Sequence, residues 1–332
     1  KPHWLQALGA AGHLYGTHMP RFRSSRIVGD EMDLTVQIGG YTVHVHEPDN
    51  HPCLTWPLRP FDRFLASSIP SPDIRVDVTV VSPLPDLPAG ELRFDSSHGC
   101  WKLFESKTGL LFESLDPKIL QPRVRACISD DYRSVQAWIL PDLADRQIGW
   151  SPMQLFNPLI EVCFLSRLAR EGGILLHASG LSFCEQGYVF TGPSGAGKST
   201  IAELFADRGA TVLSDERVIV RMRDNGFVLF GTPWVGSGQY AANASAPMTA
   251  LYCIQHGQKH HQIETLKPST VVTRILQQAF LPHWDRSGVE TTLEVLTSLI
   301  TAMPCRSLAF LNRLDIVDFL LSCSSELHTA VT

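Results

Sequence analysis

One stretch of this 332-residue chain, Gly192 to Ser199, constrains the fold more than any other. Its sequence, GPSGAGKS, matches the phosphate-binding loop pattern G-x-x-x-x-G-K-[ST] at every fixed position. Residues 187–191 before it predict a short buried strand, and residues 199–206 after it predict a helix, which is the order that the motif requires. The glycines allow a tight turn that aims successive N–H groups at one anion, and the helix adds its positive N-terminal end.

This loop predicts a nucleoside triphosphate site. We expect Lys198 to reach the β- and γ-phosphates and the hydroxyl of Ser199 to bind Mg²⁺. A Gly-rich turn that binds nothing is the weaker interpretation, because all fixed positions are filled and both flanks fit. The residues expected to hold the nucleotide are Gly192, Pro193, Ser194, Gly195, Ala196, Gly197, Lys198, Ser199 and Thr200.

Bulk properties exclude several classes of protein. The net charge of -5 argues against a nucleic-acid partner, and no apolar run approaches the roughly 20 residues that span a bilayer. The eight cysteines form no C-x-x-C pair, so we expect no zinc site and a reducing environment. No signal peptide is visible, although the chain does not begin with Met and a removed segment stays open. Together these features predict a cytoplasmic protein without a membrane partner.

The first part of the chain, residues 1–150, is expected to form a β-rich domain, for which substrate recognition is one candidate role that the sequence leaves open. Residues 34–38 and 41–46 alternate apolar and polar side chains around Gly39-Gly40, which predicts a hairpin. Further short strands are expected at 74–80, 101–104, 109–112, 124–128 and 135–139. His44 and His46 share one strand face and could bind a metal, but without a further ligand nearby we interpret them as surface residues.

The second part, residues 151–332, is expected to be an α/β domain that contains the phosphate loop. A helix over 152–170 should end at Gly172-Gly173, and a strand over 174–183 follows. Strands are then expected at 211–213, 217–220, 227–230, 248–255 and 308–311, a short polar pair at 259–266, helices from 270 onward, and a closing helix at 315–321. The Gly/Ser/Ala-rich stretch 234–246 is a candidate lid or substrate loop.

Two acids follow the helix after the phosphate loop. Asp215 and Glu216 come at the end of a predicted strand, where phosphoryl-transfer enzymes hold Mg²⁺ or accept a proton from a hydroxyl. Neighbours on a strand point to opposite faces, so both acids can face the loop only if the chain bends there. A pair of solvated surface acids is the alternative. We therefore predict Ser199, Asp215 and Glu216 as metal ligands.

A histidine and three basic residues complete the candidate chemistry. His177 lies in an apolar run and taken alone would be a core residue. Its strand should pair with the strand that enters the loop, which would bring His177 near the γ-phosphate. Arg217, Lys267 and Arg274 could stabilise charge on the transferred group, but each is expected to be a solvated surface residue.

The order of these motifs resembles the HPr serine kinase/phosphorylase family. The matching segments are residues 176–179 (LHAS), the loop at 192–199 and residues 213–216 (LSDE), within a match over about residues 172–235. The resemblance implies a P-loop kinase core like that of ATP-dependent phosphoenolpyruvate carboxykinases. It implies that His177 takes the catalytic histidine position and Asp215 that of the first acid, the proposed base. Glu216 stands where the family has a second Asp, which leaves the division of roles open.

The chain is similar to a divergent branch of that family, which includes lasso-peptide kinases that modify a precursor peptide. The Gly/Arg-rich segment that follows the core of HPr kinases is absent, so HPr is not the expected substrate. We hypothesise an ATP- and Mg²⁺-dependent kinase that phosphorylates a serine of a peptide or protein, with catalytic residues Asp215, His177 and Lys198. A nucleotide-binding regulatory module, or a carboxykinase-like enzyme acting on a small acid, is the alternative. Homo-oligomerisation stays open.

Overall fold

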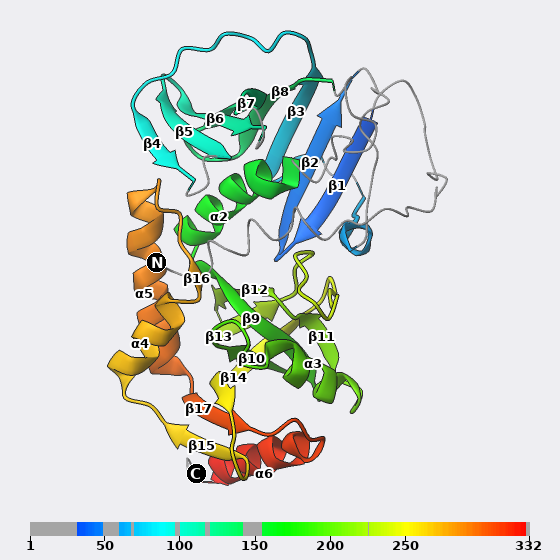
Figure 1. Ribbon diagram of the computed structural model, residues 1–332, viewed down its shortest axis with the longest axis vertical. Coiled ribbons are helices and arrows are strands. Elements are labelled where there is room, and N and C mark those ends of the chain that lie inside the picture. Colours follow the sequence, from blue (N-terminus) through cyan, green and yellow to red (C-terminus); the bar gives the residue numbers. More distant parts are fainter. Residues whose placement is uncertain are drawn as a thin grey trace. The chain divides into compact units, whose positions relative to one another are not determined.

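The computed structural model describes residues 32–48, 60–67, 70–96, 100–116, 120–141, 155–224 and 226–329 of a mixed α/β chain (Figure 1). These residues divide into two compact units, each with its own sheet. The first unit contains the described residues up to Arg167 together with Pro282–Val289, and the second contains Leu168–Leu281 and the described residues from Glu290 onward. The sequence placed the boundary near residue 150, whereas the chain passes from the first unit to the second between Arg167 and Leu168. Most of the predicted helix over 152–170, as far as it is described, therefore belongs to the first unit rather than to the second.

The first unit contains an eight-stranded sheet in the order β1-β2-β3-β8-β7-β6-β5-β4. Strand β3 pairs in parallel with β2 and β8, and all other neighbours are antiparallel. The predicted hairpin is confirmed, since Gly39 and Gly40 both have positive φ between β1 and β2. The strands are β1 (Met32–Ile38), β2 (Tyr41–Glu47), β3 (Ile74–Val80), β4 (Leu92–Asp95), β5 (Trp101–Ser106), β6 (Gly109–Leu115), β7 (Pro122–Ser129) and β8 (Ser134–Ile139), with a short 3₁₀ helix η2 (Phe61–Phe64).

The two histidines of β2 lie against the facing strand. His44 is only 7% exposed, so its prediction as a surface residue is wrong. Its Nδ1 lies 2.9 Å from Oγ1 of Thr35, and its Nε2 lies 3.2 Å from Oδ1 of Asp33. The same Asp33 oxygen lies 2.9 Å from Nδ1 of His46. Even so, the described residues contain no group of three or more His, Cys, Asp or Glu arranged to hold a metal ion.

The elements of the second half follow the predicted order. They are η3 (Leu155–Ile160, a π-helix), α2 (Glu161–Arg170), β9 (Gly173–Phe183), β10 (Gln186–Thr191), α3 (Lys198–Ala206), β11 (Thr211–Ser214), β12 (Arg217–Arg223), β13 (Gly226–Phe230), β14 (Ser245–His256), β15 (Gln262–Thr265), α4 (Pro268–Leu276), β16 (Ala279–Phe280), α5 (Arg286–Ala302), β17 (Cys305–Phe310) and α6 (Asp315–Thr329). None of the helices in the described residues is long and apolar enough to cross a membrane.

The sheet of the second unit brings the ends of parallel strands together next to the phosphate loop. Strand β10 pairs in parallel with β14, which pairs in parallel with β17. The long strand β9 pairs antiparallel with β12 through its first half and with β10 through its second half, as predicted for the strand that carries His177. Ligand sites in such sheets lie outside the carboxyl ends of the parallel strands.

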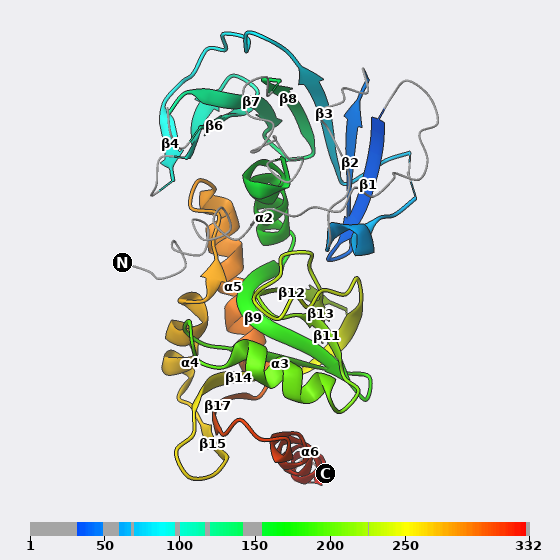
Figure 2. The same cartoon turned by 45° about the vertical axis from the view of Figure 1, so that its right-hand side comes forward.

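Alternating side chains place two separate apolar cores on the faces of this sheet. Tyr188 and Phe190 of β10 pack with residues of α3 and α6, whereas Val189 packs with residues of α4 and α5. Helix α3 lies against β9 and β10 (Figure 2). The beginning of the phosphate loop is therefore flanked by α3 on one face and by α4 on the other.

Several predicted bounds differ from the structure. Strand β14 begins at Ser245, inside the stretch predicted as a loop, and α6 continues to Thr329. The predicted polar pair at 259–266 is the single strand β15, which pairs with β17. The helix predicted over 152–170 is a π-helix that contains Pro158, followed by α2, because proline lacks the N–H that an α-helix would use there. Residues 152–154 lie outside the described part of the chain.

Candidate active site

The predicted phosphate loop connects β10 to α3, as the motif requires. Gly195 and Gly197 have φ of 80° and 101°, the left-handed region that favours glycine. At Gly197 a side chain would also collide with the sheet, since an added Cβ would lie 2.8 Å from the ring of Phe310. This close packing explains why a glycine is needed directly before Lys198.

Lys198 is buried at the beginning of α3. Its Nζ donates hydrogen bonds to the backbone oxygens of Gly192 at 3.0 Å and Pro193 at 3.3 Å. Burial lowers the pKa of Lys198, although the negative charge of Glu216 acts in the opposite direction. The lysine ammonium is thus held inside the loop and near an acid.

Asp215 lies in the bend between β11 and β12 and is only 1% exposed. Its Oδ1 accepts a hydrogen bond from the backbone N–H of Gly236 at 2.9 Å, and its Oδ2 accepts one from Gly238 at 2.7 Å. The hydroxyl of Ser199 lies 3.4 Å from the same Oδ2 and 3.2 Å from the hydroxyl of Ser237. The structure therefore brings together Ser199 and Asp215, two of the three predicted metal ligands.

Glu216 pairs with His177. The histidine Nε2 lies 3.3 Å from Oε1 of Glu216, whose side chain is 24% exposed. Burial acts to raise the pKa of Glu216, but the hydrogen bond and charge of His177, with the charges of Arg217 and Lys198, outweigh it and hold this pKa below its usual value. His177 itself is fixed by β9, where its backbone N–H donates to the oxygen of Gln278 at 2.7 Å.

The bend allows both carboxylates to face the same loop. A Cβ added to Gly236 would lie 2.9 Å from Oδ2 of Asp215 and 3.1 Å from Oε2 of Glu216. Strand alternation, which would separate neighbouring side chains, ends at Ser214 and resumes at Arg217. Hydroxyl and carboxylate oxygens are the ligands that Mg²⁺ prefers, so the oxygens of Ser199 and Asp215 are of the kind that this ion binds. Glu216, the third predicted ligand, is paired with His177 instead.

The three predicted basic residues have different surroundings. Arg217 is buried, with its guanidinium carbon 4.8 Å from the ring centre of Phe280 and 5.8 Å from that of Trp234, so its prediction as a solvated charge is wrong. Lys267 is exposed, as predicted. Arg274 is half-buried and lines a pocket.

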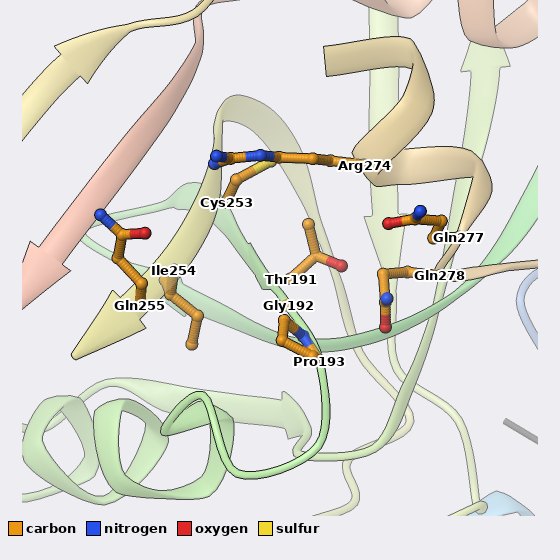
Figure 3. A pocket seen from close by; sticks show the side chains of 9 residues that line it. All are labelled: Thr191, Gly192, Pro193, Cys253, Ile254, Gln255, Arg274, Gln277 and Gln278. Carbon is orange, nitrogen blue, oxygen red and sulfur yellow. The ribbon is translucent and has the colours of Figure 1, made fainter. Parts of the chain in front are cut away.

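Sequence reasoning missed several residues around the loop. His256, at the end of β14, places its Nε2 2.6 Å from the backbone oxygen of Gly195. Gly236 and Gly238 bind Asp215 through backbone groups, which no side-chain pattern could indicate. A pocket of about 280 Å³, lined by both polar and apolar groups, also adjoins the beginning of the loop (Figure 3). Its lining residues are Thr191, Gly192, Pro193, Cys253, Ile254, Gln255, Arg274, Gln277 and Gln278.

Comparisons with known proteins give only a distant similarity. No family model matches the chain, and no curated protein matches it. Among solved structures, it is similar to the HPr(Ser) kinase/phosphatase from Coxiella burnetii, at 14% sequence identity and a TM-score of 0.28, over 47% of this chain and 98% of that one. A similarity this weak carries no argument about function, which must therefore be argued from the geometry of the site.

Proposed function

We propose that this chain is a kinase that binds ATP and Mg²⁺ at residues 192–200 and phosphorylates a serine hydroxyl of a peptide or protein. The observation that carries the proposal is the gathering of Ser199, Asp215, Glu216 and His177 at the mouth of a loop that holds a buried lysine. Phosphoryl transfer needs positioning and charge stabilisation more than covalent chemistry, and these residues offer both.

Different groups of the site bind the phosphates and the metal ion. Backbone N–H groups of residues 194–200 and the ammonium of Lys198 bind the phosphates. To do so, the ammonium gives up its hydrogen bonds to the backbone oxygens of Gly192 and Pro193. Ser199 and Asp215 would hold Mg²⁺, which would supply positive charge beside the phosphate oxygens. Asp215 suits this role because the amides of Gly236 and Gly238 fix its orientation.

Glu216 is then the group that contacts the acceptor hydroxyl and accepts its proton. Its side chain is more exposed than that of Asp215, and His177 holds it in place. The acceptor oxygen forms a bond to the γ-phosphorus, the bond from that phosphorus to the bridging oxygen of ADP breaks, and the hydroxyl proton moves to Glu216. This division assigns the base to Glu216 rather than to Asp215, which the sequence alone favoured.

The experiment is phosphoryl transfer from γ-labelled ATP to a library of serine-containing peptides, with the label located by mass spectrometry. We expect labelled peptides from the unaltered protein and none from Lys198→Ala. If ATP binds but no peptide is labelled above background, the protein is a regulatory nucleotide-binding module. Label on a small acid would instead favour a carboxykinase-like enzyme.

A further inference from the structure

The pocket beside the phosphate loop is built from three elements of the second unit (Figure 3). Thr191 and the first two loop residues come from the end of β10, and residues 253–255 come from the end of the parallel strand β14. Arg274 comes from α4, and Gln277 and Gln278 directly follow that helix. The residues that line the pocket include neither the proposed Mg²⁺ ligands, Ser199 and Asp215, nor the proposed base, Glu216.

The pocket adjoins the beginning of the loop, at Gly192 and Pro193. Gly192 and Pro193 form one wall of the pocket, and their backbone oxygens are the acceptors for Lys198. The lysine of such a loop reaches the β- and γ-phosphates, so we place the pocket near the phosphoryl group that is transferred, with only this wall of backbone between them. A molecule bound in the pocket would therefore be an acceptor rather than the adenosine of ATP.

Arg274 brings a positive charge to the pocket. Within the described residues, Arg274 has no carboxylate within ion-pair distance, and its Nη1 lies 3.5 Å from Oγ of Ser307. Arg274 also lies next to the thiol of Cys253. Burial raises the pKa of this thiol, so it is neutral at pH 7. An arginine without a carboxylate suits an oxyanion, because its planar guanidinium can donate two parallel hydrogen bonds.

Three glutamine side chains complete the lining. The side-chain amides of Gln255, Gln277 and Gln278 form no hydrogen bond with the described residues, and each can donate and accept. The volume of about 280 Å³ admits one side chain or chain end but not a folded domain. The lining thus fits a short flexible segment that carries a negative charge.

We propose that this pocket is an acceptor subsite in which Arg274 binds a carboxylate of the peptide substrate, close to the serine that is phosphorylated. The proposal rests on the proposed kinase function. The carboxylate has two sources, an Asp or Glu side chain or the C-terminal carboxylate of the peptide, and the experiment separates them.

The test uses three mixtures of serine-containing peptides that are identical except for charge. One carries randomised Asp and Glu with an amidated C-terminus, one carries Asn and Gln with a free C-terminal carboxylate, and one carries Asn and Gln with an amidated C-terminus. We expect one of the two anionic mixtures to be phosphorylated about tenfold more efficiently than the neutral one, through KM, because a charge-assisted hydrogen bond is worth about this much. Arg274→Gln should abolish this preference, and Arg274→Lys should keep part of it.

Arg306→Gln is the matched control. This half-buried arginine lies on β17, next to the strand β14 that lines the pocket, but does not itself line the pocket. It should leave the preference unchanged. Equal use of all mixtures, or an anionic preference that persists in Arg274→Gln, overturns the subsite while the kinase function stands.

A binding measurement covers the case in which no peptide is phosphorylated. Fluorescence polarisation of the labelled mixtures, with ADP present, reports the pocket without any transfer step. Binding of an anionic mixture that is lost in Arg274→Gln supports the subsite even if the kinase function fails. If no anionic mixture binds in a manner that depends on Arg274, the subsite proposal is wrong.

Discussion

Two adjacent acids, Asp215 and Glu216, contact different partners in this site, which supports the separate roles that we propose for them. Asp215 contacts the loop serine and two backbone amides, whereas Glu216 contacts a histidine and retains some exposure. Because the surroundings of a carboxylate set what it can bind, the two should respond differently to removal of charge.

The first prediction separates these roles. Asp215→Asn should raise the Mg²⁺ concentration needed for half-maximal activity and lower kcat about 100-fold, because it removes a charged metal ligand. Glu216→Gln should lower kcat by about 100-fold with an unchanged requirement for Mg²⁺, because it removes the proton acceptor. Steady-state kinetics over a range of Mg²⁺ concentrations measure both. Full transfer by Glu216→Gln would return the role of base to Asp215.

The second prediction concerns Lys198, whose pKa is lowered by burial in the free protein. Bound phosphates favour the charged ammonium and so raise the pKa of Lys198. At pH values above the lowered pKa of the free protein, nucleotide binding should therefore be accompanied by uptake of a proton. The affinity for ATP is then expected to fall with rising pH at values below 10.5, the usual lysine pKa. Titration with a fluorescent ATP analogue from neutral to alkaline pH measures this trend. The weak residual ATP binding of Lys198→Ala should not fall with pH in this way. An equally steep pH dependence in that variant would contradict the assignment of the trend to Lys198.

At the scale of elements, the bend between β11 and β12 and the loop over residues 231–244 depend on each other. The loop supplies two amides to Asp215, and Leu213 accepts a backbone hydrogen bond from Ala242. Gly236 and Gly238 both approach the acids closely, but neither has positive φ. Their need for glycine is therefore a matter of space rather than of backbone conformation.

A third prediction follows from this crowding. An alanine Cβ at position 238 would lie 2.8 Å from Oδ2 of Asp215, so Gly238→Ala should displace either the loop or the carboxylate. We expect at least a tenfold loss of kcat, together with a higher requirement for Mg²⁺, because a small misplacement of a catalytic group has large effects on rate. Ser237→Ala is the control, since it removes only a contact with Ser199 and should change kcat less. Equal effects of the two variants would show that the crowding is unimportant.

Local patterns predicted the elements, whereas contacts between distant residues escaped prediction. The strand, loop and helix around residues 186–206 follow from hydrophobic periodicity and a motif, both of which lie within one short window. The pairing of His177 with Glu216 was not derivable, because it needs the register between β9 and β12. The burial of Arg217 likewise depends on two rings, those of Trp234 and Phe280, from other parts of the chain.

On the scale of the whole molecule, each unit has its own sheet, and all the residues of the proposed site belong to the second unit. The sequence indicated a β-rich first part and an α/β second part. It could not indicate that Pro282–Val289 belongs with the first unit, because this segment is far from the rest of that unit in the chain. A ligand that binds one unit stabilises that unit directly by mass action.

The last prediction uses this separation. At an ADP–Mg²⁺ concentration about 100 times the dissociation constant, amides that exchange through unfolding of the second unit should exchange about 100-fold more slowly. The effect should be largest in β9, β10 and α3, whose hydrogen bonds surround the loop, and should be absent from β6 and β7 of the first unit. Hydrogen–deuterium exchange read by mass spectrometry measures it, with Lys198→Ala as a control that should show little protection. Equal protection of β6 and β7 would mean that the two units unfold together, since ligand binding in one could stabilise the other only through such cooperativity.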